Sequence, residues 1–187
     1  AVVLSLIASI TFFYYKGNLE VDLFLSLLTA LIFIGLVGLI DDIKKLPYKF
    51  RLLIQFLVST VIILFYFEKL GSLVLYPLPL SGIIVYLVFG LSLVWFMNLY
   101  NFMDGINGLA SIQGISFFLG VGIVSSIFYP ELDHNYFWSF VAIFLGFLLW
   151  NFPRARIFLG DVGSGSMGIF IAIYLVYLSK EIGHIPE

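Results

Sequence analysis

The chain has 187 residues, of which 62% are hydrophobic and only 11% are charged, and its mean hydropathy is +1.13. This composition leaves too little polar surface for a water-soluble domain, and it predicts a membrane protein. The absence of cysteine excludes disulfides and thiolate metal sites, and a net charge of −2 gives no electrostatic reason for binding nucleic acid.

Seven apolar segments predict an all-α fold, a polytopic transmembrane helical bundle. A helix needs roughly 20 residues to cross a hydrocarbon core of about 30 Å, so the first and sixth segments are short. We expect one integral membrane domain over residues 1–187. The predicted helices are Val2–Tyr15, Leu23–Ile40, Leu52–Phe67, Ser81–Leu99, Ile106–Phe128, Phe137–Trp150 and Gly165–Leu178.

If successive helices alternate in direction, the basic residues fall unevenly on the two sides of the membrane. The poorer side receives Lys16, Lys69 and Lys180. The richer side, which the positive-inside rule makes cytoplasmic, receives Lys44, Lys45, Lys49, Arg51, Arg154 and Arg156. The same alternation places four carboxylates on the cytoplasmic side, namely Asp41, Asp42, Asp104 and Asp161. We therefore expect one composite site on that face.

The first polar cluster is the pair Asp41 and Asp42, which closes the second predicted helix. Negative charge at a helix C-terminus is opposed by the helix dipole, so compensation is expected. Two interpretations stay open. The basic residues from Lys44 to Arg51 could act as ordinary solvated neighbours, or one carboxylate could hold a cation or a proton while the other stays ionised.

The second polar cluster ends the fourth predicted helix. Asn98, Asn101 and Asp104 are three residues apart, which places them on one helix face. Gly105 and Gly108 then predict a break that lets the backbone approach a ligand and starts a helix whose free amides could receive a phosphate. The alternative is a plain glycine turn with polar caps.

The third polar cluster precedes the seventh predicted helix. Here Asp161 is expected to point at the site, while Gly163 and Ser164 cap a helix N-terminus suited to an anion. Arg154 and Arg156 add cations for a diphosphate. The three clusters together predict a Mg²⁺ and diphosphate site at a membrane surface, between a soluble nucleotide and a lipid phosphate.

The predicted metal ligands are oxygen atoms of Asp161 and Asn101. Mg²⁺ is usually bound through one or two carboxylates, several waters and substrate phosphates, so this set suits it better than zinc. Mn²⁺ is the alternative ion.

Three segments carry a family resemblance: GLIDDIKKLPYKFRLLIQ, NLYNFMDGINGLA and NFPRARIFLGDVGS. They resemble, in order, the signature motifs of the polyprenyl-phosphate N-acetylhexosamine-1-phosphate transferases, or glycosyl transferase family 4. The resemblance implies transfer of a sugar 1-phosphate from a UDP-sugar to undecaprenyl phosphate, with release of UMP. It also implies Mg²⁺ dependence and a cytoplasmic active site in the bacterial inner membrane. The NLYNFMDG segment is most similar to the branch that initiates O-antigen synthesis.

The resemblance also implies roles for single residues. Asp161 matches the metal-binding aspartate and Asn101 the asparagine that completes the protein ligands. The expected catalytic residues are Asp41, Asp42 and Asp104. Asn107 replaces the second aspartate of the usual DGxDG pattern, so a contact to uracil would become an amide hydrogen bond or differ. The expected substrate-binding residues are Asn98, Gly105, Asn107, Arg154, Arg156, Gly163 and Ser164.

Two segments typical of the family are not in this sequence. Members carry a PRGGG-like segment before the first predicted helix and a histidine-rich cytoplasmic loop after the seventh. His134 and His184 are expected on the outer side as ordinary surface residues. We therefore expect a portion of a larger enzyme, with an inactive truncated homologue, an ion-coupled transporter and a non-catalytic scaffold as alternatives. Homo-oligomerisation stays open.

Overall fold

The computed structural model describes residues 1–66, 72–75, 78–81, 83–128 and 135–182. His134 and His184 lie outside these residues, so the predictions for them have no structural counterpart. In chain order the elements are α1 (Val2–Tyr15), α2 (Val21–Lys44), α3 (Tyr48–Tyr66), β1 (Ser72–Leu75), β2 (Leu78–Ser81), α4 (Ile83–Met103), α5 (Leu109–Phe128), α6 (Asn135–Asn151) and α7 (Gly160–Ile182).

Every predicted helix is present, which confirms the helical-bundle fold. Several helix ends differ from the prediction by up to five residues, and two of these differences change the place of a polar cluster. Helix α2 extends to Lys44, so the aspartate pair lies in its last turn and not beyond it. Helix α7 begins at Gly160 and not at Gly165. A small antiparallel hairpin, in which Ser72 of β1 pairs with Ser81 of β2, was not predicted.

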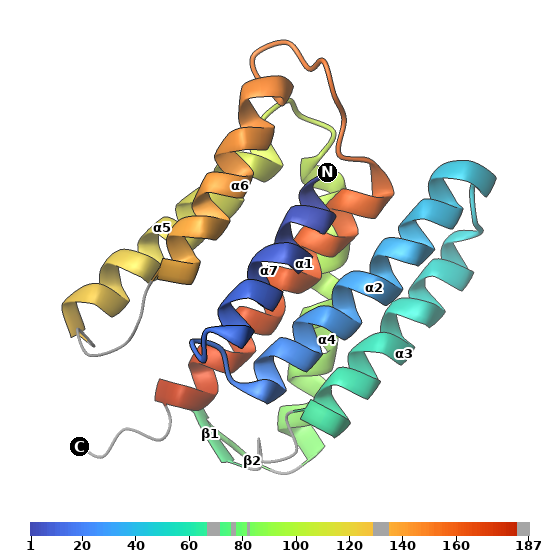
Figure 1. The fold of residues 1–187 in the computed structure, drawn as a ribbon. Coiled ribbons are helices and arrows are strands. Elements are labelled where there is room, and N and C mark those ends of the chain that lie inside the picture. Colours follow the sequence, from blue (N-terminus) through green and yellow to red (C-terminus); the bar gives the residue numbers. More distant parts are fainter. Residues whose placement is uncertain (67–71, 76–77, 82, 129–134, 183–187) are drawn as a thin grey trace.

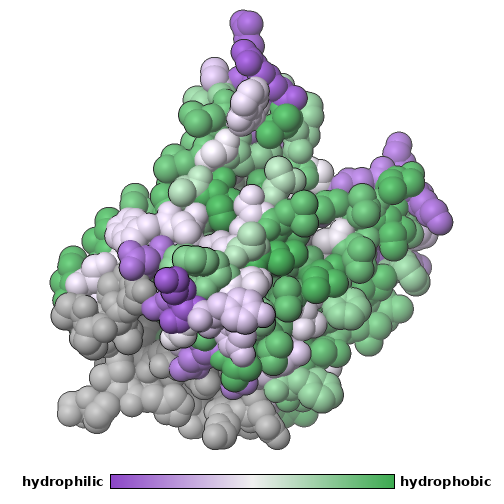
Figure 2. Space-filling view, in the orientation of Figure 1, coloured by the Kyte–Doolittle hydropathy of each residue, from purple (hydrophilic) through white to green (hydrophobic). Residues whose placement is uncertain are grey.

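The described helices suit a multi-pass membrane protein. Five of them, α2 to α5 and α7, are long and apolar enough to cross a bilayer, while α1 and α6 are shorter apolar helices. Hydrophobic residues cover most of the surface seen in Figure 2, and hydrophilic residues gather toward its ends. An apolar exterior of this kind is stable in lipid, where helices satisfy their backbone hydrogen bonds internally.

Helix α7 is the centre of the bundle. It packs against α2 and α4, and every residue from 163 to 174 is buried. Helices α5 and α6 form a separate pair, visible on the left of Figure 1. Tilted and T-shaped contacts among the rings of Phe118, Phe140 and Phe170 join this pair to α7, with ring centroids 4.9–5.7 Å apart.

The three connections that carry the polar clusters lie at the same end of the bundle. In Figure 1 the links α2–α3, α4–α5 and α6–α7 are at the upper end, whereas the hairpin and the end of α7 are at the lower end. The predicted alternation of the helices is therefore confirmed, and it brings residues from distant parts of the sequence to one face.

Two glycines allow α7 to touch its neighbours backbone to backbone. A Cβ atom added at Gly38 of α2 would lie 2.5 Å from the amide nitrogen of Val162, and one added at Gly168 of α7 would collide with the carbonyl oxygen of Phe96 in α4. Small residues are favoured at helix crossings in membranes because they permit such close approach. These crossings fix where α7 begins relative to α2 and α4.

Gly168→Ala should destabilise the protein by about 1–3 kcal/mol, because the added methyl group meets fixed backbone atoms and forces α4 and α7 apart. The measurement is the thermal unfolding midpoint in detergent. Gly146→Ala is the matched control, since a Cβ at that position in α6 meets nothing within 4 Å, and the change should cause no loss. Equal midpoints for the two variants would contradict the close α4–α7 crossing.

Candidate functional site

Asp41 is the buried member of the aspartate pair. Its side chain is 5% exposed; one oxygen accepts a hydrogen bond from the Leu46 amide at 2.6 Å, and the other lies 2.5 Å from the guanidinium of Arg51. The chain turns sharply here because Lys45 adopts a left-handed conformation with φ of 50°. This turn returns α3 alongside α2 and brings Arg51 back to Asp41.

Asp42 points in a different direction, because adjacent residues on an α-helix are about 100° apart. Its carboxylate accepts a hydrogen bond from the Asp161 amide at 3.0 Å and lies 3.4 Å from the Val162 amide. These amides belong to the first turn of α7. The two side chains therefore have different partners: Asp42 contacts the first amides of α7, whereas Asp41 pairs with Arg51 of α3 and lies beside the Asp161 side chain.

Asp161 joins three helices. The Asn101 side chain of α4 donates a hydrogen bond to one of its oxygens, and the Arg51 guanidinium lies 3.5 Å from the other. The same Asn101 nitrogen lies 3.1 Å from the Ser164 hydroxyl. The structure thus brings together residues from α2, α3, α4 and α7.

A small polar cavity of about 30 Å³ lies between these four helices. Its polar lining residues are Asp41, Arg51, Gln55, Asn98, Asn101 and Asp161. The Asn98 amide donates to the Gln55 carbonyl oxygen at 2.8 Å, which orients both side chains. A cavity of this size accommodates a water or a small ion, not a nucleotide.

Asp104 lies just beyond α4, half-buried beside the start of α7. Burial raises the pKa of this carboxyl, and the charges of Asp161 and Asp42 raise it further, while a hydrogen bond from the Gly160 backbone acts in the opposite direction. Four carboxylates therefore lie near this end of α7: Arg51 pairs with Asp41 and Asp161, while Asp104 interacts with the charges of Asp161 and Asp42. Such an excess of negative charge attracts cations.

Asp104→Asn should raise the melting temperature at pH 7 in metal-free buffer. A carboxyl whose pKa is raised by folding is penalised when it is ionised in the folded state, so its cost is present at neutral pH and fades as the pH falls toward the unfolded-state pKa of 3.8. The difference between variant and wild type should accordingly shrink on acidification. A variant that is less stable at pH 7 would contradict the electrostatic account.

The α4–α5 link is attached to the α6–α7 link by two asparagines. Asn151 accepts a hydrogen bond from the Gly108 amide at 2.6 Å and donates one to the Ile157 carbonyl at 2.9 Å. Asn107, which the sequence analysis assigned to substrate, donates to the Pro153 carbonyl at 3.2 Å. Because Asn151 occupies the Gly108 amide, this amide is not free to receive a phosphate, and phosphate binding by the free amides of the helix that follows stays a prediction.

The predicted capping of α7 by Gly163 and Ser164 was wrong. Gly163 and Ser164 do not cap the helix: both are buried within its first turns, and Asp42 provides the cap. The Ser164 hydroxyl faces Asn101 instead of solvent. The other predicted binding residues, Gly105, Arg154 and Arg156, are exposed at the same end of the bundle. Among the described residues, neither arginine forms an ion pair.

The donor chemistry of the cavity fits an oxygen-liganded cation. Asp161 offers a carboxylate and Asn101 an amide carbonyl, although the described residues contain no cluster of three histidine, cysteine, aspartate or glutamate side chains that could enclose a metal. Mg²⁺ needs no such enclosure, because it keeps several waters and takes ligands from substrate phosphates.

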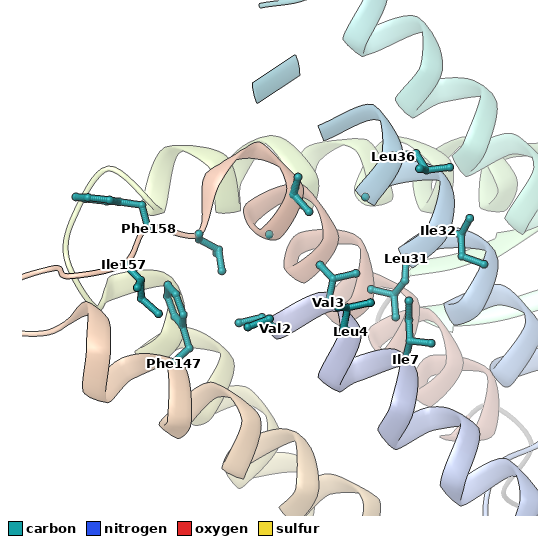
Figure 3. A pocket seen from close by; sticks show the side chains of 15 residues that line it. Val2, Val3, Leu4, Ile7, Leu31, Ile32, Leu36, Phe147, Ile157 and Phe158 are labelled. Carbon is teal, nitrogen blue, oxygen red and sulfur yellow. The ribbon is translucent and has the colours of Figure 1, made fainter. Parts of the chain in front are cut away.

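Two apolar grooves open on the flanks of the bundle. One, of about 550 Å³, lies between α1, α2, α6 and the start of α7, and Figure 3 shows Val2, Leu31 and Phe147 around it. The other, of about 710 Å³, lies between α3 and α4, where Phe56 and Trp95 line it. Asn98 lines both this second groove and the polar cavity, so the two are adjacent.

Comparisons with known proteins agree with the motifs. The sequence model of glycosyl transferase family 4 matches residues 24–179. The chain is 34% identical to a phospho-N-acetylmuramoyl-pentapeptide-transferase of Streptococcus gordonii, over 95% of this chain and 57% of that protein. For the transferase of the same name in Leuconostoc citreum the identity is 29%, over 88% and 55%. The chain thus spans just over half the length of these relatives.

Proposed function

The chain belongs to glycosyl transferase family 4, and we propose that it carries the membrane site of an enzyme that transfers a sugar 1-phosphate to a polyprenyl phosphate. The donor is a UDP-sugar of the N-acetylhexosamine type, and UMP is released. One observation carries this proposal: Asp41 and Asp161 meet Arg51 in a cavity that adjoins an apolar groove, with Asp42 and Asp104 close by at the start of α7. A lipid phosphate and a soluble diphosphate could both reach that place.

The reaction balances as a phosphoryl transfer. An oxygen of the lipid phosphate attacks the β-phosphorus of the UDP-sugar, the bond from that phosphorus to the bridging oxygen breaks, and the bridging oxygen leaves with UMP. Two anions must approach each other, so charge neutralisation is the main task of the site. Arg51, Arg154 and Arg156 supply fixed positive charge at this end of the bundle.

Asp161 and Asn101 would hold Mg²⁺. When bound there, Mg²⁺ supplies the positive charge that a diphosphate needs as its leaving group develops. Asp41 would keep Arg51 in place at the cavity, since it is the closest carboxylate to that guanidinium. Asp104 lies near enough to Asp161 to raise the local negative charge that draws the cation in.

The lipid chain fits best in the groove between α3 and α4. This groove is apolar along Phe56 and Trp95, and Asn98 connects it to the polar cavity. A polyprenyl chain lying in it would remain at bilayer depth while its phosphate reached the carboxylates. The orientation in the membrane follows from the basic residues, which gather at this end and favour a cytoplasmic site.

An ion-coupled transporter is the second candidate. Transporter sites usually lie near the bilayer midplane on interrupted helices. Here the carboxylates lie at helix ends, and α2, α4 and α7 are continuous through their apolar stretches. The location therefore favours a surface reaction with a lipid headgroup.

The test is UMP release by the complete protein that contains this chain, with polyprenyl phosphate, Mg²⁺ and a panel of UDP-sugars. The panel should include UDP-N-acetylmuramoyl-pentapeptide, since the relatives are named for that group, and UDP-N-acetylglucosamine, for the branch that initiates O-antigen synthesis. We expect UMP only when donor and lipid are both present. UMP formation independent of the lipid would contradict the proposal, as would substrate-coupled ion flux in liposomes without any UMP.

A further inference from the structure

The start of α7 lacks a cap from its own sequence. The residues at this point are Leu159 and Gly160, and neither has a side chain that accepts a hydrogen bond. Helices leave their first amides without intrahelical partners, and Ser, Thr, Asp or Asn usually satisfies one of them. In this protein the acceptor comes from a helix more than one hundred residues earlier: Asp42 accepts from Asp161 at 3.0 Å and faces Val162 at 3.4 Å.

The surrounding residues are shaped for this contact. Gly38 lies one turn before Asp42 on α2, and a Cβ there would collide with the Val162 amide and the Asp161 carbonyl. Gly160 has φ of +68°, and a Cβ there would lie 2.8 Å from an Asp42 oxygen. Both glycines are therefore needed for the Asp42 carboxylate to reach the end of α7.

We infer that Asp42 is a positioning residue, which caps α7 from α2 and thereby fixes Asp161 in the site. This inference deepens the proposed function and rests on it. The amide that Asp42 holds belongs to Asp161, whose side chain faces Asn101 and Arg51. The required chemistry is a hydrogen-bond acceptor, and the negative charge adds a favourable interaction with the helix N-terminus.

A cap and a general base at Asp42 predict different effects of substitution. Asn is about as good a helix cap as Asp, whereas Ala removes the acceptor. If Asp42 were instead a general base, the substitutions by Asn and by Ala would both remove that base and would reduce turnover equally. Asp42→Asn should therefore retain most of the turnover of the complete protein, and Asp42→Ala should not.

Two measurements other than enzyme activity report whether the Asp42 cap is present. The first is hydrogen exchange, by mass spectrometry, of peptides that cover the first turn of α7. The second is Mn²⁺ binding, used as a spectroscopic probe of the metal site. Asp42→Ala should speed the exchange and weaken Mn²⁺ binding roughly fivefold, the equilibrium effect of losing a typical cap, whereas Asp42→Asn and Asp42→Ser should stay near wild type. Asp22→Ala is the matched control, because it removes an exposed carboxylate from the opposite end of α2.

Unchanged exchange in Asp42→Ala would overturn the inference, as would loss of turnover in Asp42→Asn with exchange and Mn²⁺ binding intact. If Asp42→Ala does not fold, the inference is tested by comparing turnover, hydrogen exchange and Mn²⁺ binding of Asp42→Asn and Asp42→Ser with those of the wild type. Failure of the proposed function is a separate result: the wild type would release no UMP, while the exchange and Mn²⁺ data would still test the cap.

Discussion

Asp161→Asn is expected to abolish UMP release by the complete protein and to remove most of its affinity for Mg²⁺ or Mn²⁺. The substitution keeps the size of the side chain and its capacity to bond with Asn101, but it removes the charge that a hard cation prefers. Turnover should fall by about a thousandfold or more, because a cation at the diphosphate contributes several kcal/mol to the transition state. The measurements are UMP release and Mn²⁺ binding by the same preparation.

Two comparisons make this result specific. Asn101→Ala should act in the same direction but less severely, since it removes a neutral oxygen donor. Asp22→Asn, at the far end of α2, should match the wild type in both measurements. Normal UMP release by Asp161→Asn, with an unchanged Mg²⁺ requirement, would exclude Asp161 as a metal ligand.

Arg51→Gln is expected to destabilise the protein by about 1–3 kcal/mol, because it leaves the buried Asp41 carboxylate without its counter-charge. The expected loss lies below the range for fully buried pairs, since the Arg51 side chain is 32% exposed. For a chain of this size the melting temperature in detergent should fall by several degrees. Arg51→Lys keeps the charge and should recover part of the loss.

The double variant separates the ion pair from general damage. Asp41→Asn combined with Arg51→Gln should be more stable than Arg51→Gln alone, because no unpaired charge then stays buried. Additive losses in the double variant would mean that the 2.5 Å contact between Arg51 and Asp41 contributes nothing to stability.

The helices and their common end were predictable because long apolar runs admit few folds in a membrane. Each run must be helical and successive runs must alternate, so the order of the runs along the chain suffices to place Asp41, Asp104 and Asp161 on one face. The spacing of Asn98 and Asn101 similarly predicted a shared helix face, and both line the polar cavity.

The start of α7 was not predictable from local preferences. The stretch from Gly163 to Gly168 alternates glycine with serine and methionine, which resembles a loop because glycine and serine are weak helix formers in water. In a membrane bundle the same small residues favour tight helix crossings. Gly168 lies at such a crossing, with α4 directly against its Cα.

The contacts of Asp42, Arg51 and Asn151 could not be predicted from the sequence either. The catalytic role expected for Asp42 stays a prediction, and its hydrogen-bond partner is the start of a helix more than one hundred residues away. Arg51 stood among ordinary basic residues, and only the turn at Lys45 returns it to Asp41. Asn151 opened the third polar segment without a predicted role, and its bond to Gly108 depends on how two distant links meet.

The most direct test of the central account follows the β-phosphorus of the donor. The complete protein should be incubated with Mg²⁺, polyprenyl phosphate and a UDP-sugar labelled with ³²P at the β-phosphate. The account predicts that the label moves into the lipid phase, with one UMP formed for each labelled lipid, and that Asp161→Asn prevents both. Release of labelled UDP, with unlabelled sugar on the lipid, would contradict it, because the bond to the sugar would then have broken instead of the bond between the phosphates.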